Sequence, residues 1–359
     1  MTVLLLLGGF AVLVAGGELL VRGAAGLARR LRLSPLVVGL TVVSFATSAP
    51  ELAVTVDAAL SGSPGLAVGN VVGSNITNVL LVLGVAGLIL PLTVRLSAVR
   101  RDVPVMIAMS GLLLVLSIGG TIGRADGVVL LATVATYVAW TVVRSRRAGA
   151  ADAGRDDGPA VRARRPWVDA LLVTGGVALL VVGARWLVTG ATDVATALGM
   201  SELVVGLTVV AVGTSLPELA TSVIAAIRGD VEMAVGNVVG SCIFNIGAVM
   251  GGAAVLAPSG VPVDPGAVRL DLPVMLVAAL ALLPVAFTGF RVARWEAGLF
   301  VLYYAAYVTY LLLDSSGHDA LPTFSAVMLW FVLPITALTL VVLVSYEVGL
   351  RRGRRAAVR

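Results

Sequence analysis

Long apolar segments alternate with short polar or arginine-bearing connections along the whole chain. Each apolar segment holds about 18 or more residues, which is the length that an α-helix needs to cross the hydrocarbon core of a bilayer. Eleven such segments predict transmembrane helices over residues 2–28, 35–60, 66–92, 103–120, 125–143, 167–198, 202–227, 232–257, 271–289, 295–313 and 321–346. The fold class predicted from this pattern is an all-α polytopic membrane protein.

The composition agrees with this prediction. Of the 359 residues, 59% are hydrophobic and 13% are charged, and the mean hydropathy is +1.05. These values exceed what a water-soluble domain needs to fill its core. The first apolar segment starts at Met1 without a basic region before it, so we expect it to be a retained span rather than a signal peptide. The single cysteine, Cys242, excludes an internal disulfide.

All 25 basic residues are arginine, and they are distributed unevenly between the two sides of the predicted spans. The connections on one side carry 21 of them, whereas the other side carries Arg124 and Arg269. Basic residues concentrate on the cytoplasmic side of membrane proteins, which predicts an external N-terminus and a cytoplasmic C-terminus. The net charge of +5 therefore needs no nucleic-acid partner. The absence of lysine is typical of high-GC coding and favours a bacterial-type plasma membrane.

The chain contains an internal repeat. Residues 36–84 align with residues 203–251 at a constant offset of 167, and 30 of the 49 positions are identical, including matched Thr, Ser, Pro, Glu, Gly and Asn. Each copy lies in a group of five spans, and an odd number of spans makes the second group enter the membrane from the opposite face. The predicted organisation is a first five-helix repeat (1–143), a charged cytoplasmic linker (144–166), a second, inverted five-helix repeat (167–314), an extra helix (321–346) and a basic cytoplasmic tail (347–359).

Two glutamates occupy equivalent positions in this repeat. Glu51 and Glu218 fall near the middle of the second and seventh spans, and each follows a Thr-Ser pair and a proline. A carboxylate inside the hydrocarbon costs at least about 2.5 to 3.5 kcal/mol, so a duplicated pair requires an explanation. Binding of a cation near the bilayer midplane provides one.

The residues before each glutamate can supply further oxygen ligands. Pro50 and Pro217 lack an amide hydrogen, so they release backbone carbonyls in the preceding turn of each helix. Carboxylate, hydroxyl and carbonyl oxygens suit calcium and sodium better than zinc or copper. Helical spacing puts these candidates on the face of each glutamate: Ser48, Thr47 and Ser44 in the first copy, and Ser215, Thr214 and Ala211 in the second.

The third and eighth spans carry one polar stripe each, with residues repeating every four positions. The stripes consist of Asn70, Ser74 and Asn78, and of Asn237, Ser241 and Asn245. Taken alone, these residues could equally be ligands or interhelical hydrogen-bonding groups. Glu18 and Arg185 occupy equivalent positions of the first and sixth spans, and we interpret them as structural or gating charges rather than ligands.

At these segments the sequence resembles the calcium:cation antiporter superfamily, specifically the prokaryotic sodium/calcium exchangers with paired alpha-repeats. The patterns GxTxxxxxTSxPE and GNxxGSxxxN each occur twice, and ten spans, residues 1 to about 314, fit the family. The resemblance implies a calcium site and sodium sites with no cofactor. The implied ligands are Glu51, Glu218, Ser48, Ser215, Ser74, Ser241, the backbone of Thr47, Thr214 and Ala211, and the nearby Asn78 and Asn245.

This chain departs from the family at two of these positions. The family often has Asp where Asn245 stands and Ala where Ser44 stands, and an amide at position 245 leaves only two core carboxylates. The predicted function is secondary-active exchange of Ca²⁺ for Na⁺ by alternating access. A proton-coupled or potassium-coupled calcium exchanger is the nearest alternative, and a cation channel or an intramembrane enzyme would be alternatives of another class. The pattern does not predict the oligomeric state.

Overall fold

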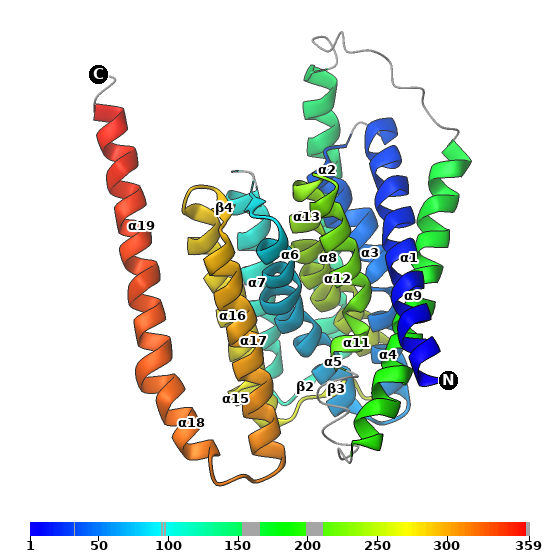
Figure 1. The fold of residues 1–359 in the computed structure, drawn as a ribbon, viewed down its shortest axis with the longest axis vertical. Helices are drawn as coiled ribbons and strands as arrows, with labels where there is room; N and C mark the ends of the chain where they lie inside the picture. The colour runs from blue at the N-terminus through cyan, green and yellow to red at the C-terminus, as the bar shows by residue number, and fades with distance from the viewer. Residues whose placement is uncertain (32, 95, 97, 153–165, 199–210, 357–359) are drawn as a thin grey trace.

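The computed structural model describes residues 1–31, 33–94, 96, 98–152, 166–198 and 211–356. Three predicted regions therefore lie partly outside the described residues: the linker, the start of the seventh span and the end of the basic tail. Within the described ranges, the molecule is a bundle of long, mostly upright helices (Figure 1). The prediction of an all-α membrane protein is confirmed, and the strands that accompany the helices are only two residues long.

The first half of the chain up to the linker contains eight α-helices, three π-helical turns and two strands. These are α1 (Thr2–Leu31), α2 (Pro35–Val38), η1 (Gly39–Val43), α3 (Ser44–Thr47), α4 (Ala49–Leu60), α5 (Pro64–Thr77), η2 (Asn78–Val82), α6 (Leu83–Ile89), β1 (Leu92–Thr93), η3 (Ala98–Asp102), α7 (Val103–Ser117), β2 (Thr121–Ile122) and α8 (Arg124–Asp152).

The described elements of the second half are α9 (Pro166–Ala197), α11 (Ala211–Thr214), α12 (Leu216–Ile227), α13 (Val231–Phe244), η5 (Asn245–Met250), α14 (Gly251–Leu256), β3 (Val261–Pro262), α15 (Pro265–Arg269), α16 (Asp271–Phe287), β4 (Arg291–Val292), α17 (Arg294–Ser315), α18 (Leu321–Val327), η6 (Met328–Val332) and α19 (Leu333–Ala356). They follow an order similar to that of the first half from α11 onward, with α15 in place of η3, and end with α18, η6 and α19.

Eight helices of the described chain are long and apolar enough to cross a membrane, and a ninth span is possible if a bent pair is counted as one. The bent pair consists of Pro35–Thr47 and Ala49–Leu60, which meet at 45°. The span predicted over 103–120 appears as α7, with 15 residues, which is shorter than a full span. The described part of the span predicted over 202–227 contains α11 and α12, with 4 and 12 residues. The count of eleven therefore remains a prediction.

Two small antiparallel sheets connect the halves of the chain. β1 pairs with β4, and β2 pairs with β3, so each sheet takes one strand from each half. β1 and β3 both follow the helix that carries an asparagine stripe, and β2 and β4 both follow the next helix. Each sheet therefore pairs the strand after a stripe-bearing helix in one half with the strand after the next helix in the other half. Exchanging the two halves converts one sheet into the other, which is what a pseudo-twofold relation between the halves would produce. Composition and periodicity gave no signal for these strands.

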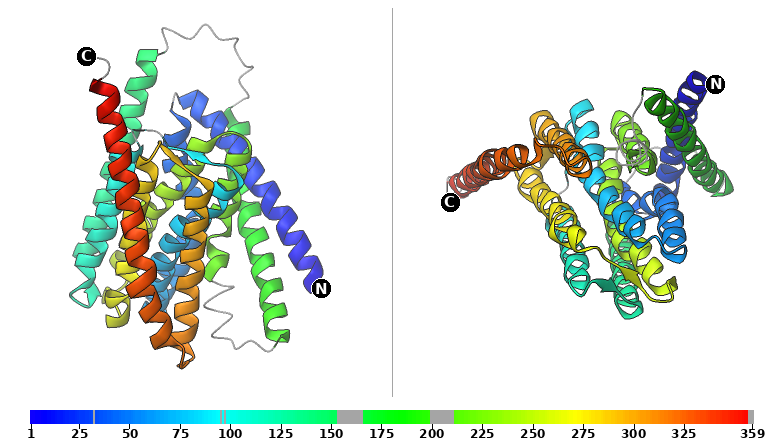
Figure 2. Two further views of the ribbon diagram at one scale, coloured as in Figure 1. Left: turned by 60° about the vertical axis from the view of Figure 1, so that its left-hand side comes forward. Right: turned by 90° about the horizontal axis from the view of Figure 1, so that it is seen from below.

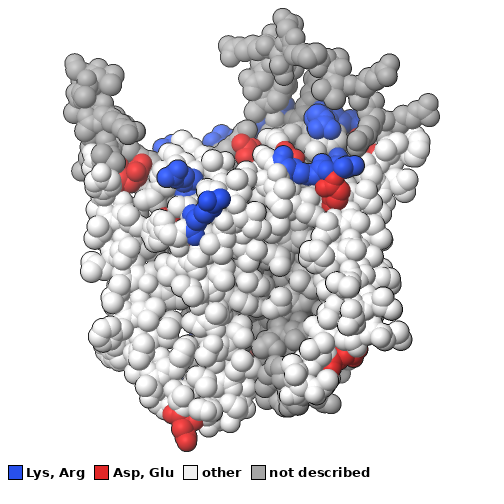
Figure 3. All heavy atoms as spheres, viewed as in Figure 1, with Lys and Arg blue, Asp and Glu red and all other residues white. Residues whose placement is uncertain are grey.

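The chain begins and ends at opposite ends of the bundle. α1 starts at the lower end in Figure 1, whereas α19 finishes at the upper end. Arginines gather at the upper end in the space-filling view (Figure 3), where the last turn of α1 carries Arg29 and Arg30. This uneven distribution follows the bias seen in the sequence, because basic side chains concentrate on one side of a membrane.

The two longest helices, α1 and α9, cross each other at the edge of the bundle (Figure 2) and pack through glycines. A Cβ atom placed on Gly176 would lie 2.6 Å from the backbone nitrogen of Leu20 and 2.8 Å from the carbonyl oxygen of Gly16. Gly9 and Gly183 make an equally close pair seven residues, or about two helical turns, away. Small residues at such crossings let helix backbones approach closely where no hydrophobic effect drives association.

Glu18 connects this helix pair to the rest of the bundle. Its carboxylate forms ion pairs with Arg22 of α1, at 2.6 Å, and with Arg228, which follows α12. Arg185, its counterpart by sequence position, is exposed on α9 and makes no ion pair with the residues that the structure describes. Glu18 therefore has a structural contact, and the two equivalent positions are used differently.

The glycine packing generates a first prediction. Gly176→Ala is expected to destabilise the protein by about 1 to 3 kcal/mol, because the methyl group would overlap the α1 backbone. Gly175→Ala is the matched control, since no described atom lies within 4 Å of the added Cβ. The thermal unfolding midpoint in detergent measures both, and an equal shift for the two variants would contradict the packing described here.

Candidate functional site

Both glutamates follow a break in a helix. The helix breaks between α3 and α4 at Ser48 (φ −80°, ψ 1°) and between α11 and α12 at Ser215 (φ −91°, ψ 5°). Pro50 and Pro217 are each the second residue of the helix after the break, where a missing amide hydrogen does no harm. The sequence prediction that the prolines interrupt these helices is confirmed.

The break places each carboxylate in the first turn of a helix. Glu51 lies in the first turn of α4, and Glu218 lies in the first turn of α12. The free amide groups and the dipole of a helix N-terminus favour negative charge. The short helix before each break ends in carbonyl groups that have lost their helical partners, which are suitable ligands for cations. A broken helix therefore supports an anion and offers cation ligands at the same point.

The two glutamates belong to one buried cluster that combines both halves of the chain. Each is 0% exposed, and each helix that carries one of them packs against the π-turn of the opposite half, α4 on η5 and α12 on η2. The hydroxyls of Thr47 and Ser241 lie beside the Glu218 carboxylate and 3.4 Å from one another. Thr47 also lies 3.3 Å from Oδ1 of Asn237. Residues about 190 positions apart in the chain are thus brought into contact.

Two asparagines hold the backbone at the glutamates. Nδ2 of Asn70 donates to the carbonyl of Glu51 at 3.2 Å and to Thr55 Oγ1 at 2.8 Å. Nδ2 of Asn237 donates to the carbonyl of Glu218 at 3.4 Å and to Ser222 Oγ at 2.9 Å. The same hydrogen bonds recur in both halves at identical sequence separations. The amide groups of these two stripe residues therefore act as interhelical hydrogen-bonding groups.

Many polar atoms around the glutamates are buried without a hydrogen-bond partner. They are both carboxylate oxygens of Glu51 and of Glu218, the hydroxyls of Ser48, Ser74 and Ser215, both side-chain polar atoms of Asn78, and Oδ1 of Asn245. Buried polar groups in native proteins are almost always paired, and an unpaired one costs about 1 to 3 kcal/mol. Such a concentration at one place indicates a site that an oxygen-binding ligand completes.

The cluster has the donor set of a hard cation. Among the residues that the structure describes, no group of three or more His, Cys, Asp or Glu side chains is placed to hold a metal ion. A cation at this cluster would rely on two carboxylates together with neutral hydroxyl, amide and carbonyl oxygens. Ca²⁺ and Na⁺ accept such mixed oxygen ligands, whereas zinc prefers nitrogen and sulfur.

Three of the predicted ligands, Ser44, Thr214 and Ala211, are not among the buried residues with unpaired side-chain oxygens. The Ser44 hydroxyl donates to the carbonyl of Gly39 at 2.6 Å and lies 2.9 Å from that of Asn237, so it faces α13. Thr214 is half-buried at the end of α11, and Ala211 is the first residue of that helix. The remaining candidates are buried on the helices that carry the glutamates or on helices packed against them, since α4 packs on α5 and η5, and α12 packs on α13 and η2.

Asn78 and Asn245 each begin a π-helical turn, η2 and η5 respectively. A π-turn inserts one extra residue into an α-helix, so it rotates the side chains before the turn relative to those after it. Such turns are frequent at functional sites in helical proteins. The sequence identified both asparagines by their spacing, but it gave no indication of the π-turns.

The cluster is enclosed unequally on its two sides. Thr47, at the end of α3, and Asn237, in α13, are buried. Their equivalents Thr214, at the end of α11, and Asn70, in α5, are only half-buried. In Figure 1, α3 and α13 lie higher in the bundle than α11 and α5. Equivalent residues of the two halves therefore differ in exposure, and the cluster is less covered toward the end at which α1 begins.

The sequence prediction missed Asn75 and the contacts of Cys242. Nδ2 of Asn75 donates to the carbonyl of Cys242 at 3.3 Å, and Oδ1 of Asn75 accepts from Nδ2 of Asn245 at 3.2 Å. The Asn245 amide is thereby oriented with its nitrogen toward Asn75, while its oxygen has no partner. The equivalent Asn78 has no such neighbour, because position 242 is cysteine. In the sequence, the alignment of Cys242 with Asn75 at the offset of 167 was the only feature that pointed to this difference between the halves.

Comparison with known proteins agrees with this geometry. The family model described as sodium/calcium exchanger protein matches residues 1–143 and 168–313. The chain belongs to this family. The Sodium/calcium exchanger MaX1 of Methanosarcina acetivorans is 30% identical over 343 residues, which cover 86% of this chain and 97% of the relative. The Inner membrane protein YrbG of Escherichia coli is 34% identical over 280 residues, which cover 77% of this chain and 86% of the relative.

Solved structures lead to the same family. A structure of the sodium-calcium exchanger NCX_Mj superposes with a TM-score of 0.73 and 31% sequence identity, covering 86% of this chain and 97% of the other. The resemblance to the calcium:cation antiporters is confirmed. This member of the sodium/calcium exchanger family is an integral membrane antiporter of cations and not an enzyme.

The hydrogen bonds of Asn75 generate a second prediction. Asn75→Ala is expected to lower stability by about 1 to 3 kcal/mol, because it leaves the buried Asn245 amide nitrogen without an acceptor. Cys242→Ala is the matched control, since it removes only a weak thiol donor and keeps the backbone carbonyl that Asn75 contacts. Thermal unfolding in detergent compares the two, and a larger loss for Cys242→Ala would contradict the assignment.

Proposed function

We propose that this exchanger moves Ca²⁺ in one direction and Na⁺ in the other through the buried cluster, near the bilayer midplane. The observation that carries the proposal is the set of unpaired oxygens around Glu51 and Glu218, which a cation would satisfy. The proposed ligands are these two carboxylates with Thr47, Thr214, Ser48, Ser215, Ser74, Ser241, Asn78, Asn245, Ala211 and Ser44. The names of MaX1 and NCX_Mj as sodium/calcium exchangers support both ions.

Competition for shared ligands explains why the transport would be an exchange. Two carboxylates can be neutralised by one Ca²⁺ or by monovalent ions, and neither load binds fully beside the other. The empty site would carry uncompensated negative charge, and moving that charge through hydrocarbon is costly. Return of the carrier without an ion is therefore slow, so calcium movement is coupled to movement of the second ion.

Alternating access would expose the cluster to one side of the membrane at a time. The unequal burial of Thr47 and Thr214 supports a state in which the upper side is closed. The close glycine packing of α1 on α9 supports movement of these helices as one unit. The proposed motion carries this pair across the remaining bundle, alternately covering the two sides of the cluster.

The proposed architecture has eleven spans, with inverted repeats over 1–143 and 167–314. The linker (144–166), the extra helix (321–346) and the tail (347–359) complete it. The exchanged pairing of the strands and the repeated asparagine contacts support the inverted repeats. Tyr137 and Tyr307 also make equivalent hydrogen bonds, to Asp102 at 2.9 Å and to Asp271 at 2.8 Å. We place the N-terminus outside and the C-terminus in the cytoplasm of a bacterial-type cell.

The proposed site generates a third prediction. Glu51→Gln and Glu218→Gln are each expected to reduce calcium-45 uptake into proteoliposomes about ten- to hundredfold, because each removes a charged ligand. Asp57→Asn is the matched control, since Asp57 is an exposed acid on the same helix as Glu51. Retained exchange in both glutamine variants would overturn the site.

The coupling ion generates a fourth prediction. With pH clamped, a sodium gradient should drive calcium efflux from inside-out vesicles, and Ser74→Ala and Ser241→Ala should raise the half-maximal sodium concentration about tenfold. Ser110→Ala is the control, because Ser110 is equally buried but its hydroxyl donates to Met106 in α7. A response to a pH gradient without a response to sodium would favour the proton-coupled alternative. A requirement for potassium would favour the potassium-coupled one.

A further inference from the structure

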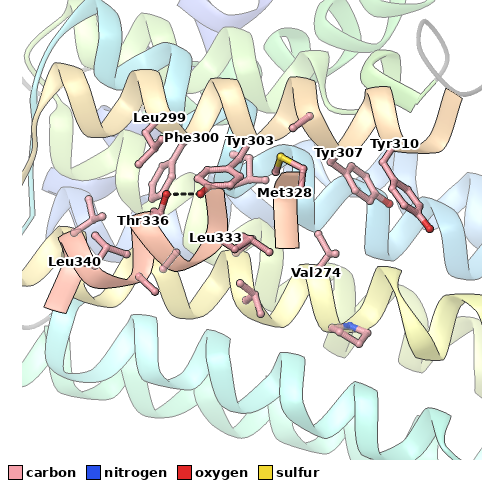
Figure 4. Close-up of a pocket in the computed structure, with 18 of the residues that line it drawn as sticks. Val274, Leu299, Phe300, Tyr303, Tyr307, Tyr310, Met328, Leu333, Thr336 and Leu340 are labelled. Atoms are coloured by element: carbon pink, nitrogen blue, oxygen red, sulfur yellow. Dashed lines mark hydrogen bonds between the residues drawn. The ribbon is translucent and has the colours of Figure 1, made fainter. Parts of the chain in front are cut away.

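The segment formed by α18, η6 and α19 encloses an apolar groove against α16 and α17. The groove has a volume of about 520 Å³ and runs along the helices (Figure 4). Tyr307 and Tyr310 lie at one of its ends, and Leu340 lies at the other. Its size falls within the range of about 300 to 1,000 Å³ that is typical of small-molecule sites. The glutamates of the ion cluster do not line it.

The outer wall of the groove is not part of the family core. The family match ends at residue 313, before α18 begins. The last helix touches the bundle through few polar contacts: the Tyr303 hydroxyl lies 2.5 Å from Thr336 Oγ1 and 3.4 Å from the carbonyl of Val332 (Figure 4). No residue of the span Leu321–Gly349 is buried in its most apolar window. The last helix therefore makes this polar contact with α17 at Tyr303, and the groove lies beside it.

The lining restricts what can occupy this room. Apolar cavities do not hold water, because water needs hydrogen-bonding partners. The groove lies along spans in the hydrocarbon region, so a flexible hydrocarbon chain is the available occupant. Lipid tails are as apolar as the side chains around them, so the hydrophobic effect alone would not retain a lipid there. Retention would depend on van der Waals contact within the groove and on contacts to the headgroup.

Charged groups stand at the end of the groove marked by Tyr310. Arg269 lines the groove, is exposed, and makes no ion pair with any described residue. Asp264 caps the start of α15, the helix that ends at Arg269, and Asp271 begins α16 two residues after Arg269. Asp271 accepts a hydrogen bond from the Tyr307 hydroxyl at 2.8 Å, which places its carboxylate at this end of the groove. A lone arginine suits a phosphate, and the surrounding carboxylates suit an ammonium group. Acidic neighbours would disfavour a headgroup with net negative charge.

We propose that this groove binds one acyl chain of a zwitterionic aminophospholipid such as phosphatidylethanolamine. Arg269 binds the phosphate, and the carboxylates near Asp271 attract the ammonium group. The last helix thereby forms a lipid site that the ten-helix core lacks. The inference is independent of which cations the exchanger carries.

Native mass spectrometry tests the proposal on the full-length protein, exchanged from membranes into detergent with equal amounts of phosphatidylethanolamine and phosphatidylglycerol. Wild-type protein should retain phosphatidylethanolamine in preference. Arg269→Ala should reduce retention about tenfold through loss of a charge-assisted contact, and Arg269→Lys should restore part of it. Arg124→Ala is the matched control, because Arg124 is an exposed arginine at the start of α8, directly after β2, and β2 lies at the same end of the bundle as α15 in Figure 1.

A second pair of variants tests the groove itself. Ala306→Phe fills the groove from α17 and should abolish retention, whereas Ala305→Phe on the neighbouring, exposed position should not. Equal retention in Arg269→Ala, Ala306→Phe and wild type would overturn the proposal. Preferential retention of phosphatidylglycerol would overturn the headgroup assignment. Conversion of a dimer to a monomer by Ala306→Phe, with unchanged lipid, would identify a second copy of the chain as the occupant instead.

Discussion

The burial of two carboxylates away from water is the constraint on which the rest of this structure depends. Glu51 and Glu218 are inaccessible to solvent and close enough for their charges to repel. Helix N-termini at both breaks reduce this cost, and the hydroxyls of Thr47 and Ser241, one from each half of the chain, lie beside Glu218. These contacts do not satisfy the carboxylates, because the side-chain oxygens of both glutamates have no hydrogen-bond partner. A bound cation would supply the compensating positive charge, and this is the physical basis of the obligatory exchange proposed above.

The same constraint explains why the surrounding packing is so close. A cation site must exclude water without losing its oxygen ligands, so helices have to approach at backbone distance. Around the site, Gly236 and Gly240 let α13 meet the backbone of the second span, and the Ser44 hydroxyl bonds into this contact. At the bundle edge, glycines join α1 to α9 as one unit. Close contact within this helix pair, which is joined to the rest of the bundle by the ion pair of Glu18 with Arg228, would suit the proposed movement of the pair as a gate.

The two halves are equivalent in their principal contacts but not in detail. Asn70 and Asn237 hold the glutamate backbones in the same way, and the strands pair with exchanged partners. Replacement of asparagine by Cys242 breaks the equivalence, since Asn245 is oriented by Asn75 whereas Asn78 has no corresponding neighbour. An ion between the halves would therefore meet unequal ligands on its two sides. The last helix adds a further asymmetry, because it has no counterpart in the first half.

The sequence alone determined the membrane class, the repeated segments, the broken helices and the identity of the buried glutamates. These features follow from local rules: hydropathy over a span, identity at a fixed offset, and the missing amide hydrogen of Pro50 and Pro217. Only the tertiary structure decided that the Ser44 hydroxyl turns toward α13, that Asn75 holds Asn245, and that α18 and α19 enclose a groove. Each of these depends on which helix lies opposite a given face. In a chain whose helices are apolar on nearly every side, periodicity does not specify that choice, and the packing of residues 170 to 210 positions apart does.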